Sequence, residues 1–203
     1  MTRPTILLDV DGPMADFASS YLDAYYWETG ERRRVGDVDR WDIHKAGWFV
    51  ERALAMGTTP HVLRARVDAH VIRPDFCSLI TPRTEAIEAV AELRQIADVY
   101  VVTSPWTSSP TWVYERTRWI ERHFGIPPKN VIHTAAKHLV HGDLLLDDKP
   151  SHVESWGERW PDGFALLYGM PHNRDAEGLT RVDWDDVITV ARALVAARCE
   201  AAE

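Results

Sequence analysis

Cysteine, long apolar runs and clustered positive charge are all scarce in this sequence. Its two cysteines, Cys77 and Cys199, lie far apart, which argues against a disulfide framework and against a metal site built from neighbouring cysteines. The apolar stretch at residues 5–10 is too short for a signal peptide, and no later stretch approaches the length that crosses a bilayer. We therefore expect a cytoplasmic protein that makes no membrane contact.

Positive charge is also in deficit overall. The chain carries 23 lysines and arginines against 31 aspartates and glutamates, which gives a formal net charge of -8. Such a protein repels a nucleic acid polymer unless its basic residues are concentrated in one place. The one basic run, residues 32–34, is short and lies between Glu31 and Asp37. We expect no nucleic acid polymer as a partner, whereas a small anion held through a metal ion is compatible with this charge.

What the sequence does contain is typical of a globular protein. Hydrophobic residues make up 45% and charged residues 27% of its 203 residues, enough for one α/β domain with an insertion. Residues 5–8 form an apolar run that predicts a buried strand. After Pro82, helical and strand patterns alternate, which predicts a parallel sheet covered by helices. The expected helices are 84–95, 112–124 and 183–197, and the expected strands are 99–102, 131–132, 144–146 and 164–168.

The segment between the first strand and Pro82 has a different character. Phe17, Tyr21 and Tyr25 repeat at helical spacing in residues 15–29, and Gly30 suits the end of that helix. The rest of the segment is expected to be helical and irregular. We predict a doubly wound, Rossmann-like core domain made of residues 1–16 and 78–203, with residues 17–77 inserted after the first strand as a small, mostly helical cap.

Polar residues follow the apolar strands where ligands of such sheets bind, beyond the carboxyl ends. Four carboxylates meeting there would repel one another unless a cation lay between them. Oxygen ligands alone favour Mg²⁺ over zinc or copper. The residues that we expect to gather are Asp9, Asp11, Asp147 and Asp148, with Thr103, Ser104 and Lys137 beside them.

Phosphoryl transfer gives each of these residue types a task. Asp9 would attack phosphorus and form an aspartyl-phosphate, which divides hydrolysis into two easier steps. Asp11 would protonate the departing alcohol and then activate water. Lys137 and the Thr103 hydroxyl would stabilise the charge that spreads over the phosphate oxygens. An Asp-x-Asp-Gly run alone is more often a turn, so the prediction depends on Asp147 closing a second apolar strand.

These residues resemble the four motifs of the haloacid dehalogenase (HAD) superfamily, in that superfamily's order. More narrowly, residues 9–17 (DVDGPMADF), 103–105 (TSP), 114–125 (YERTRWIERHFG), Lys137 and 142–148 (GDLLLDD) are similar to the 5′(3′)-deoxyribonucleotidases. The likeness runs through the core domain and is weak across the cap. It implies a HAD-type fold and a magnesium-dependent phosphatase.

The resemblance also implies individual roles. Asp9 would be the nucleophile and Asp11 the acid/base, while Mg²⁺ would contact Asp9, the Asp11 backbone carbonyl and Asp147, with support from Asp148. Thr103, Ser104 and Lys137 would hold the phosphate. The sequence departs from the family at Pro13, which stiffens the first loop, and at Trp106, Thr107 and Ala135, where an aliphatic residue and two cations are usual. The missing cations leave phosphate affinity and nucleotide preference open.

Aromatic residues in and near the cap allow two interpretations. Their rings could stack on a nucleobase, or they could form the small hydrophobic core of the cap itself. The candidate substrate-binding residues are Trp48, Phe49, Phe76 and Trp106.

Other chemistries have less support. His133, His138 and His141 cluster in the sequence, but their spacing matches no zinc motif, so we expect surface or hydrogen-bonded histidines. Nothing marks a base that could activate Cys77 as a nucleophile.

The sequence thus predicts a hydrolase acting on deoxyribonucleoside monophosphates. Two alternatives stay open: a HAD phosphatase of another small monoester such as a sugar phosphate, and a nucleotide-binding protein of the same fold without turnover. Assembly as a homodimer is left open as well.

Overall fold

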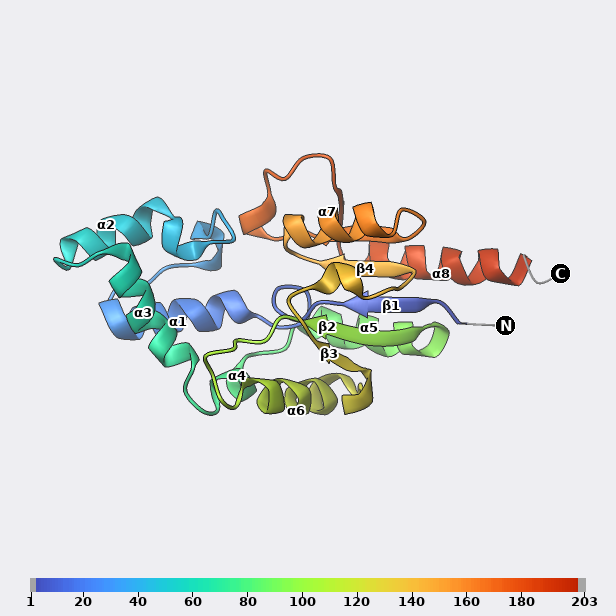
Figure 1. The fold of residues 1–203 in the computed structure, drawn as a ribbon, viewed down its shortest axis with the longest axis horizontal. Helices are drawn as coiled ribbons and strands as arrows, with labels where there is room; N and C mark the ends of the chain where they lie inside the picture. Colours follow the sequence, from blue (N-terminus) through green and yellow to red (C-terminus); the bar gives the residue numbers. More distant parts are fainter. Residues whose placement is uncertain (1–2, 201–203) are drawn as a thin grey trace.

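Six parallel strands form the centre of the molecule (Figure 1). The computed structural model describes residues 3–200. The sheet has the order β3-β2-β1-β4-β5-β6, so the first strand lies in the middle, as the doubly wound prediction requires. The strands are β1 (Thr5–Leu8), β2 (Asp98–Thr103), β3 (Val131–His133), β4 (Leu144–Asp147), β5 (Phe164–Tyr168) and β6 (Thr180–Val182).

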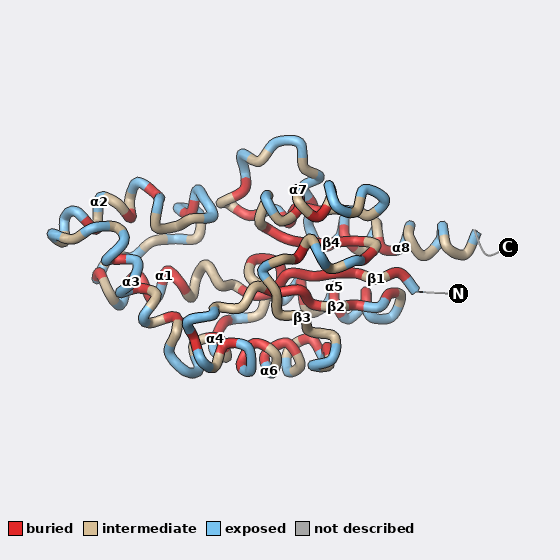
Figure 2. Tube along the Cα trace, viewed as in Figure 1, coloured by how far each residue is buried: buried red, intermediate tan, exposed pale blue. Residues whose placement is uncertain are grey.

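The middle residues of the central strands are mainly apolar, as expected for a sheet whose two faces are both covered by helices. Ile6 and Leu8 point into a large cluster that includes side chains of α5 (Thr84–Ile96), α6 (Trp112–Phe124) and α8 (Trp184–Glu200). Leu7 points to the opposite face and packs with Trp156 of α7 (Pro150–Arg159). Figure 2 shows the buried strands at the centre of these layers. Alternate residues of one strand therefore serve two hydrophobic layers.

The insertion leaves the core domain after β1 and lies at the left of Figure 1. It carries α1 (Phe17–Thr29), α2 (Gly47–Ala55), α3 (Pro60–Val71) and α4 (Phe76–Leu79), with 3₁₀ turns at Val35–Asp37 and Ile43–Lys45. Local signals start and stop these helices: the Asp16 carboxylate accepts a hydrogen bond from Ser19 N, Thr59 caps α3 ahead of Pro60, and Gly30 ends α1 with φ 69°. The range 17–77 for the cap stays a prediction.

The two ends of the insertion lie side by side at the carboxyl edge of β1. Ala15 bridges Pro82, and Arg83 N donates to Met14 O at 2.8 Å. The cap therefore departs and returns beside the loop that carries Asp9 and Asp11.

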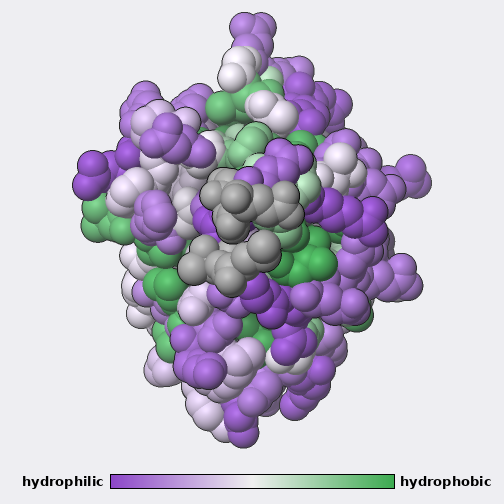
Figure 3. All heavy atoms as spheres, turned by 90° about the vertical axis from the view of Figure 1, so that its right-hand side faces the viewer, coloured by the Kyte–Doolittle hydropathy of each residue, from purple (hydrophilic) through white to green (hydrophobic). Residues whose placement is uncertain are grey.

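The termini lie at the opposite end of the molecule from the cap (Figure 1). That end is mainly hydrophilic, with apolar side chains in smaller separate areas (Figure 3). Within residues 3–200, each helix is too short or too polar to cross a membrane.

Candidate active site

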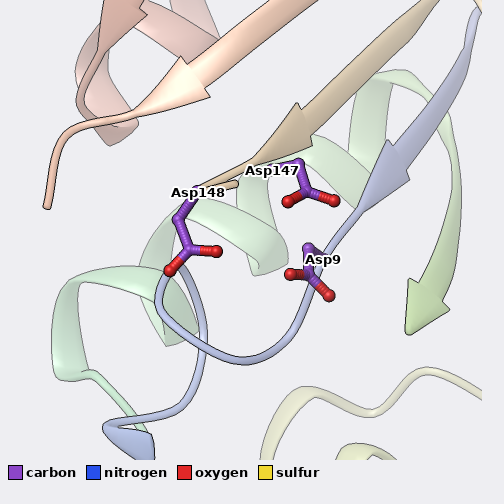
Figure 4. A group of neighbouring side chains, drawn as sticks. All are labelled: Asp9, Asp147 and Asp148. Atoms are coloured by element: carbon purple, nitrogen blue, oxygen red, sulfur yellow. The ribbon is translucent and has the colours of Figure 1, made fainter. Parts of the chain in front are cut away.

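Asp9 and Asp147 come together because their strands are neighbours. Asp9 follows β1 directly, Asp147 is the last residue of β4, and Leu8 pairs with Leu146 in the sheet. Asp148 comes next along the chain and turns its carboxylate back towards the other two (Figure 4). One oxygen of each carboxylate lies within 4.8 Å of the others. All three residues are buried.

Lys137 lies between two of these carboxylates. Its Nζ is 2.7 Å from Asp9 Oδ1 and 2.6 Å from Asp147 Oδ2, and the residue is 2% exposed. Burial alone would lower the pKa of the lysine, but the charges of Asp9 and Asp147 outweigh it and raise the pKa above its usual value. The ammonium is therefore held in its charged form.

The three carboxyl groups differ in their electrostatics. Burial raises the pKa of Asp9, and the nearby Asp147 and Asp11 add to the effect that Lys137 opposes. Burial also raises the pKa of Asp148, to which the Asp9 and Asp147 charges contribute. Burial would raise the pKa of Asp147 too, but Lys137 and His152 reverse this and lower it. The charge of Lys137 thus stabilises the ionised form of Asp147. It is not enough to stabilise the ionised forms of Asp9 and Asp148 as well.

The donor set fits a divalent cation. The three ligand groups are carboxylates, which suit a hard ion such as Mg²⁺, and Asp148 Oδ1 is buried without a hydrogen-bond partner among the described residues. A cation there would give this oxygen a partner and would favour the ionised forms of Asp9 and Asp148. The side chain of Asp11 lies outside this cluster.

Gly12 is required by the position of Asp148. It has φ +105°, and a Cβ placed on it would lie 2.0 Å from Asp148 Oδ2. A side chain at this position would therefore push the Asp148 carboxylate away from the other two. The glycine of the Asp-Val-Asp-Gly run allows both the backbone turn and the close approach.

Asp11 is paired with a residue that the sequence analysis did not assign. Arg116 of α6 donates through Nη2 to Asp11 Oδ1 at 2.6 Å and is fully buried. A signal existed, because Arg116 falls on the same buried face of α6 as Trp112, Trp119 and Ile120. A charge on the apolar face of an amphipathic helix predicts a specific partner.

Two histidines contact the carboxylates of Asp147 and Asp148. His152 Nδ1 is 3.1 Å from Asp147 Oδ2, and His172 Nε2 is 3.3 Å from Asp148 Oδ2. Asn173 Nδ2 donates to the Asp148 carbonyl at 2.7 Å. Sequence reasoning singled out neither histidine. His152 lies in the first turn of α7, five residues after Asp147, and His172 lies in the 3₁₀ turn Pro171–Asn173, which meets Asp148 only in the folded chain.

Of the predicted phosphate ligands, Ser104 and Lys137 line a cavity, whereas Thr103 is not among its lining residues. Thr103, the last residue of β2, is fully buried, and its Oγ1 has no hydrogen-bond partner among the described residues. Ser104 Oγ is 3.5 Å from Thr134 O. Ser104 and Lys137 line the cavity together with Asp9 and Asp11.

This cavity has a volume of about 400 Å³ and extends from the carboxylates to the cap. The sequence analysis had placed only some of its walls: Phe17, Trp41, Arg64 and Asp68 line it without having been predicted. The full lining is Asp9, Asp11, Phe17, Trp41, Arg64, Asp68, Ser104, Pro105, Trp106, Thr107, Ser108, Trp112, Lys137 and His152.

The candidate substrate-binding aromatics fall into two groups. Trp106 lines the cavity. Phe49 is fully buried and packs on Tyr25, while Trp48 packs edge-on against the same ring and donates to Asp37 O at 3.0 Å. Phe76 packs against the hydrophobic core. Trp48, Phe49 and Phe76 are not among the cavity-lining residues, and their packing favours the interpretation that they form the core of the cap.

Comparison with known proteins identifies the family of this chain. The chain matches the model of the family described as 5′ nucleotidase, deoxy (pyrimidine), cytosolic type C, over residues 3–198. It is 34% identical over 181 residues to a Bordetella bronchiseptica protein provisionally named a 5′(3′)-deoxyribonucleotidase, covering 88% of this chain and 90% of that protein. The human cytosolic-type 5′(3′)-deoxyribonucleotidase is 31% identical over 172 residues, covering 83% and 81%.

Solved structures share the fold at low sequence identity. A haloacid dehalogenase-like hydrolase from Streptococcus pneumoniae has a TM-score of 0.57 and 10% identity, covering 93% of this chain and 98% of that one. The expected HAD-type α/β fold is confirmed. The chain belongs to the cytosolic type C deoxy(pyrimidine) 5′-nucleotidase family and is a phosphoric monoester hydrolase with a HAD-type fold.

Proposed function

We propose that this chain hydrolyses deoxyribonucleoside monophosphates with Mg²⁺, through an aspartyl-phosphate on Asp9. The observation that carries the proposal is the buried trio of Asp9, Asp147 and Asp148 beside Lys137. Asp9 and Lys137 also line a cavity of about 400 Å³. The named 5′(3′)-deoxyribonucleotidases among its relatives support the substrate class.

The residues that would hold Mg²⁺ are Asp9, Asp147 and Asp148, with the backbone carbonyl of Asp11. Bound there, the ion supplies positive charge that offsets the repulsion between a carboxylate and a phosphate. Lys137 is held charged by its two carboxylate neighbours and provides a second cation for the phosphate oxygens. The Thr103 hydroxyl, which lacks a partner among the described residues, and Ser104 supply hydrogen bonds to the same group.

Asp11 takes part in two proton transfers during the reaction. Asp9 bonds to phosphorus while Asp11 gives a proton to the departing sugar oxygen. Asp11 then takes a proton from water as the water oxygen attacks phosphorus, which frees Asp9 and releases phosphate. The two aspartates lie on one loop, two residues apart, and both line the cavity.

The outer part of the cavity suits a nucleoside. Phe17, Trp41 and Trp106 offer aromatic faces for a base, and Arg64 with Asp68 offers polar groups at the cap end. Thr107 and Ala135 stand where the family resemblance leads us to expect cations. This difference is the observation behind a second candidate function, the hydrolysis of another small monoester such as a sugar phosphate.

The test is phosphate release from a panel of deoxyribonucleoside and ribonucleoside monophosphates and sugar phosphates, measured with Mg²⁺ and with the Asp9→Asn variant as the blank. We expect the deoxyribonucleotides to give the highest kcat/KM. Equal or faster turnover of sugar phosphates would favour the second candidate. Absence of turnover on every monoester would favour a binding protein.

We also propose residence in the cytoplasm, supported by the cytosolic-type relative; because mitochondrial relatives exist as well, fractionation of the source cell tests it. Homodimer formation stays a prediction, which light scattering at several protein concentrations checks.

A further inference from the structure

The partner of Asp11 is a guanidinium that is buried away from solvent. Arg116 is 0% exposed, and its one side-chain hydrogen bond within residues 3–200 joins Nη2 to Asp11 Oδ1 at 2.6 Å. Its Cζ lies 5.0 Å from the ring centre of Trp112 and 5.3 Å from that of Trp119. The Asp11 carboxyl group is thus hydrogen-bonded to a side chain of α6.

Arginine is a costly choice for filling this space. Nε and Nη1 of Arg116 are buried without hydrogen-bond partners among residues 3–200, so much of the desolvation of the charge is not offset. An apolar side chain of similar volume would pack between two tryptophan rings without that penalty, and replacing a buried ion pair in this way is often neutral or stabilising. Unlike an apolar side chain, the arginine can donate a hydrogen bond to Asp11.

The helix that carries Arg116 is fixed on its other side. The carboxylate of Glu115 accepts hydrogen bonds from Asp75 N at 2.9 Å and from the Ser78 hydroxyl at 3.3 Å. Trp119 Nε1 donates to Ile80 O at 2.8 Å. These contacts tie α6 to the segment that returns from the cap, so the guanidinium cannot follow Asp11 if the loop moves.

We propose that Arg116 is a positioning residue that holds the Asp11 carboxyl in one orientation, with Oδ1 bound to the guanidinium and Oδ2 facing the cavity. This inference rests on the proposed function, because it concerns the acid/base work of Asp11. Asp11 lines the cavity, and Oδ2 makes no hydrogen bond with another described residue.

The orientation decides which oxygen handles the proton. In the first step, the bond between phosphorus and the leaving oxygen breaks as Asp9 bonds to phosphorus, and the proton on Asp11 Oδ2 passes to the leaving oxygen. In the second, Oδ2 takes a proton from water as the water oxygen bonds to phosphorus and the Asp9 bond breaks. Since Oδ1 accepts a hydrogen bond throughout, both transfers use Oδ2. A positioned acid/base contributes about 10²- to 10⁴-fold to rate.

The experiment compares two substrates in Arg116→Met. A deoxyribonucleoside monophosphate needs its leaving oxygen protonated, whereas p-nitrophenyl phosphate releases a stable phenolate without help. We expect kcat for the nucleotide to fall about 10²-fold or more. With p-nitrophenyl phosphate we expect a burst of one equivalent of nitrophenolate, followed by slow turnover, because the second step still needs a positioned base. Arg118→Met, at an exposed position of the same helix with an ion pair to Glu121, is the matched control and should match the wild type.

A double-mutant comparison separates positioning from general damage. In an Asp11→Asn background, Arg116→Met should change kcat by less than about 3-fold, because both substitutions act on the same carboxyl. Should the methionine variant fail to fold, Arg116→Lys carries the test, with a smaller loss on the nucleotide and the same burst.

Equal losses on both substrates without a burst, or losses that simply multiply with those of Asp11→Asn, would overturn the assignment of Arg116. A wild type that hydrolyses neither substrate would refute the proposed function instead.

Discussion

Lys137 and Asp147 form a fully buried ion pair, with Nζ 2.6 Å from Oδ2 and exposures of 2% and 0%. The same Nζ also lies 2.7 Å from Asp9 Oδ1. One lysine thus neutralises part of the charge of two carboxylates whose residues are almost fully buried, and an unpaired charge in such a place is strongly unfavourable.

Replacing Lys137 with methionine should therefore destabilise the fold as well as abolish turnover. Removing one partner of a buried pair typically costs about 3–5 kcal/mol, and we expect a loss of this order in the free energy of unfolding, measured by urea denaturation in EDTA. Adding Asp9→Asn to Lys137→Met should restore part of the stability, because it removes one of the two uncompensated charges. A Lys137→Met variant as stable as the wild type would contradict the prediction.

Removal of the metal should stop the reaction and lower the melting temperature. We expect EDTA to abolish phosphatase activity, Mg²⁺ to restore it and Ca²⁺ to substitute poorly, because its larger and looser coordination shell misplaces the reacting groups. A ligand at a hundredfold excess over its Kd stabilises the folded state by about 2.7 kcal/mol. Asp148→Asn should remove most of the Mg²⁺-dependent rise in Tm, which scanning calorimetry can follow. Full activity in EDTA would contradict the metal assignment.

Gly12→Ala should damage the site, whereas alanine at a second glycine with positive φ, Gly30, should not. Gly12 and Gly30 both have positive φ, but a Cβ at Gly12 would clash with Asp148, while a Cβ at Gly30 meets nothing within 4 Å. Gly30→Ala should lose about 1–2 kcal/mol of stability from the left-handed backbone. Gly12→Ala should lose more, because φ +105° lies outside the left-handed region that L-residues adopt. Only Gly12→Ala should also lose Mg²⁺ affinity, measured by titration calorimetry. Equal Mg²⁺ affinities in the two variants would show that Asp148 is free to move.

We expect Trp106 to contact the substrate and Trp48 to stabilise the cap. Trp106 lines the cavity, and stacking on a base is worth about 1–3 kcal/mol, so Trp106→Ala should raise the KM for deoxyribonucleotides by about 5- to 150-fold. Trp48 packs on Tyr25 and lies outside the cavity lining, so Trp48→Ala should lower Tm and leave KM unchanged. The reverse pattern would restore the role of Trp48 in base binding.

Glu115 should make the fold sensitive to acid. Burial would raise the pKa of its carboxyl, but the nearby Thr111 hydroxyl and the hydrogen bonds from Asp75 and Ser78 outweigh burial and lower the pKa below the usual 4.5. A carboxyl whose pKa is lower in the folded state stabilises the fold above its unfolded pKa and loses that contribution as the pH falls through the folded pKa. Glu115→Gln should therefore lose less stability than the wild type between about pH 5 and pH 3. Glu121→Gln, at an exposed ion pair, should show the wild-type slope.

Much of the core domain could be predicted from the sequence because its strands are buried on both faces. The runs ending in Asp9, Thr103 and Asp147 are continuous and apolar, and the rule for parallel sheets places their ends together. Two elements were missed. β6 has three residues, two of them exposed. In α7 only Val153 and Trp156 are buried, and Gly157 and several charged residues make up much of the rest, so neither element shows a clear periodic pattern.

The parts of the site that escaped prediction depend on contacts between distant segments. Arg116 reaches Asp11 across 105 positions in the sequence, and the cavity wall from Arg64 and Asp68 depends on how the cap folds back over the sheet. Trp48 and Phe49 are aromatic, as residues of a base-binding surface often are, yet both pack against Tyr25 inside the cap. Spacing alone cannot distinguish these two uses of an aromatic ring.

Trapping the covalent intermediate tests the central claim most directly. The protein is mixed with a deoxyribonucleoside monophosphate and Mg²⁺, quenched during turnover and treated with borohydride, which reduces an aspartyl-phosphate to homoserine, and the modified peptide is then located by mass spectrometry. Our account predicts homoserine at position 9 and nowhere else, and none in Asp9→Asn. Steady turnover in a protein whose Asp9 is never phosphorylated, or reduction at a different aspartate, would contradict it.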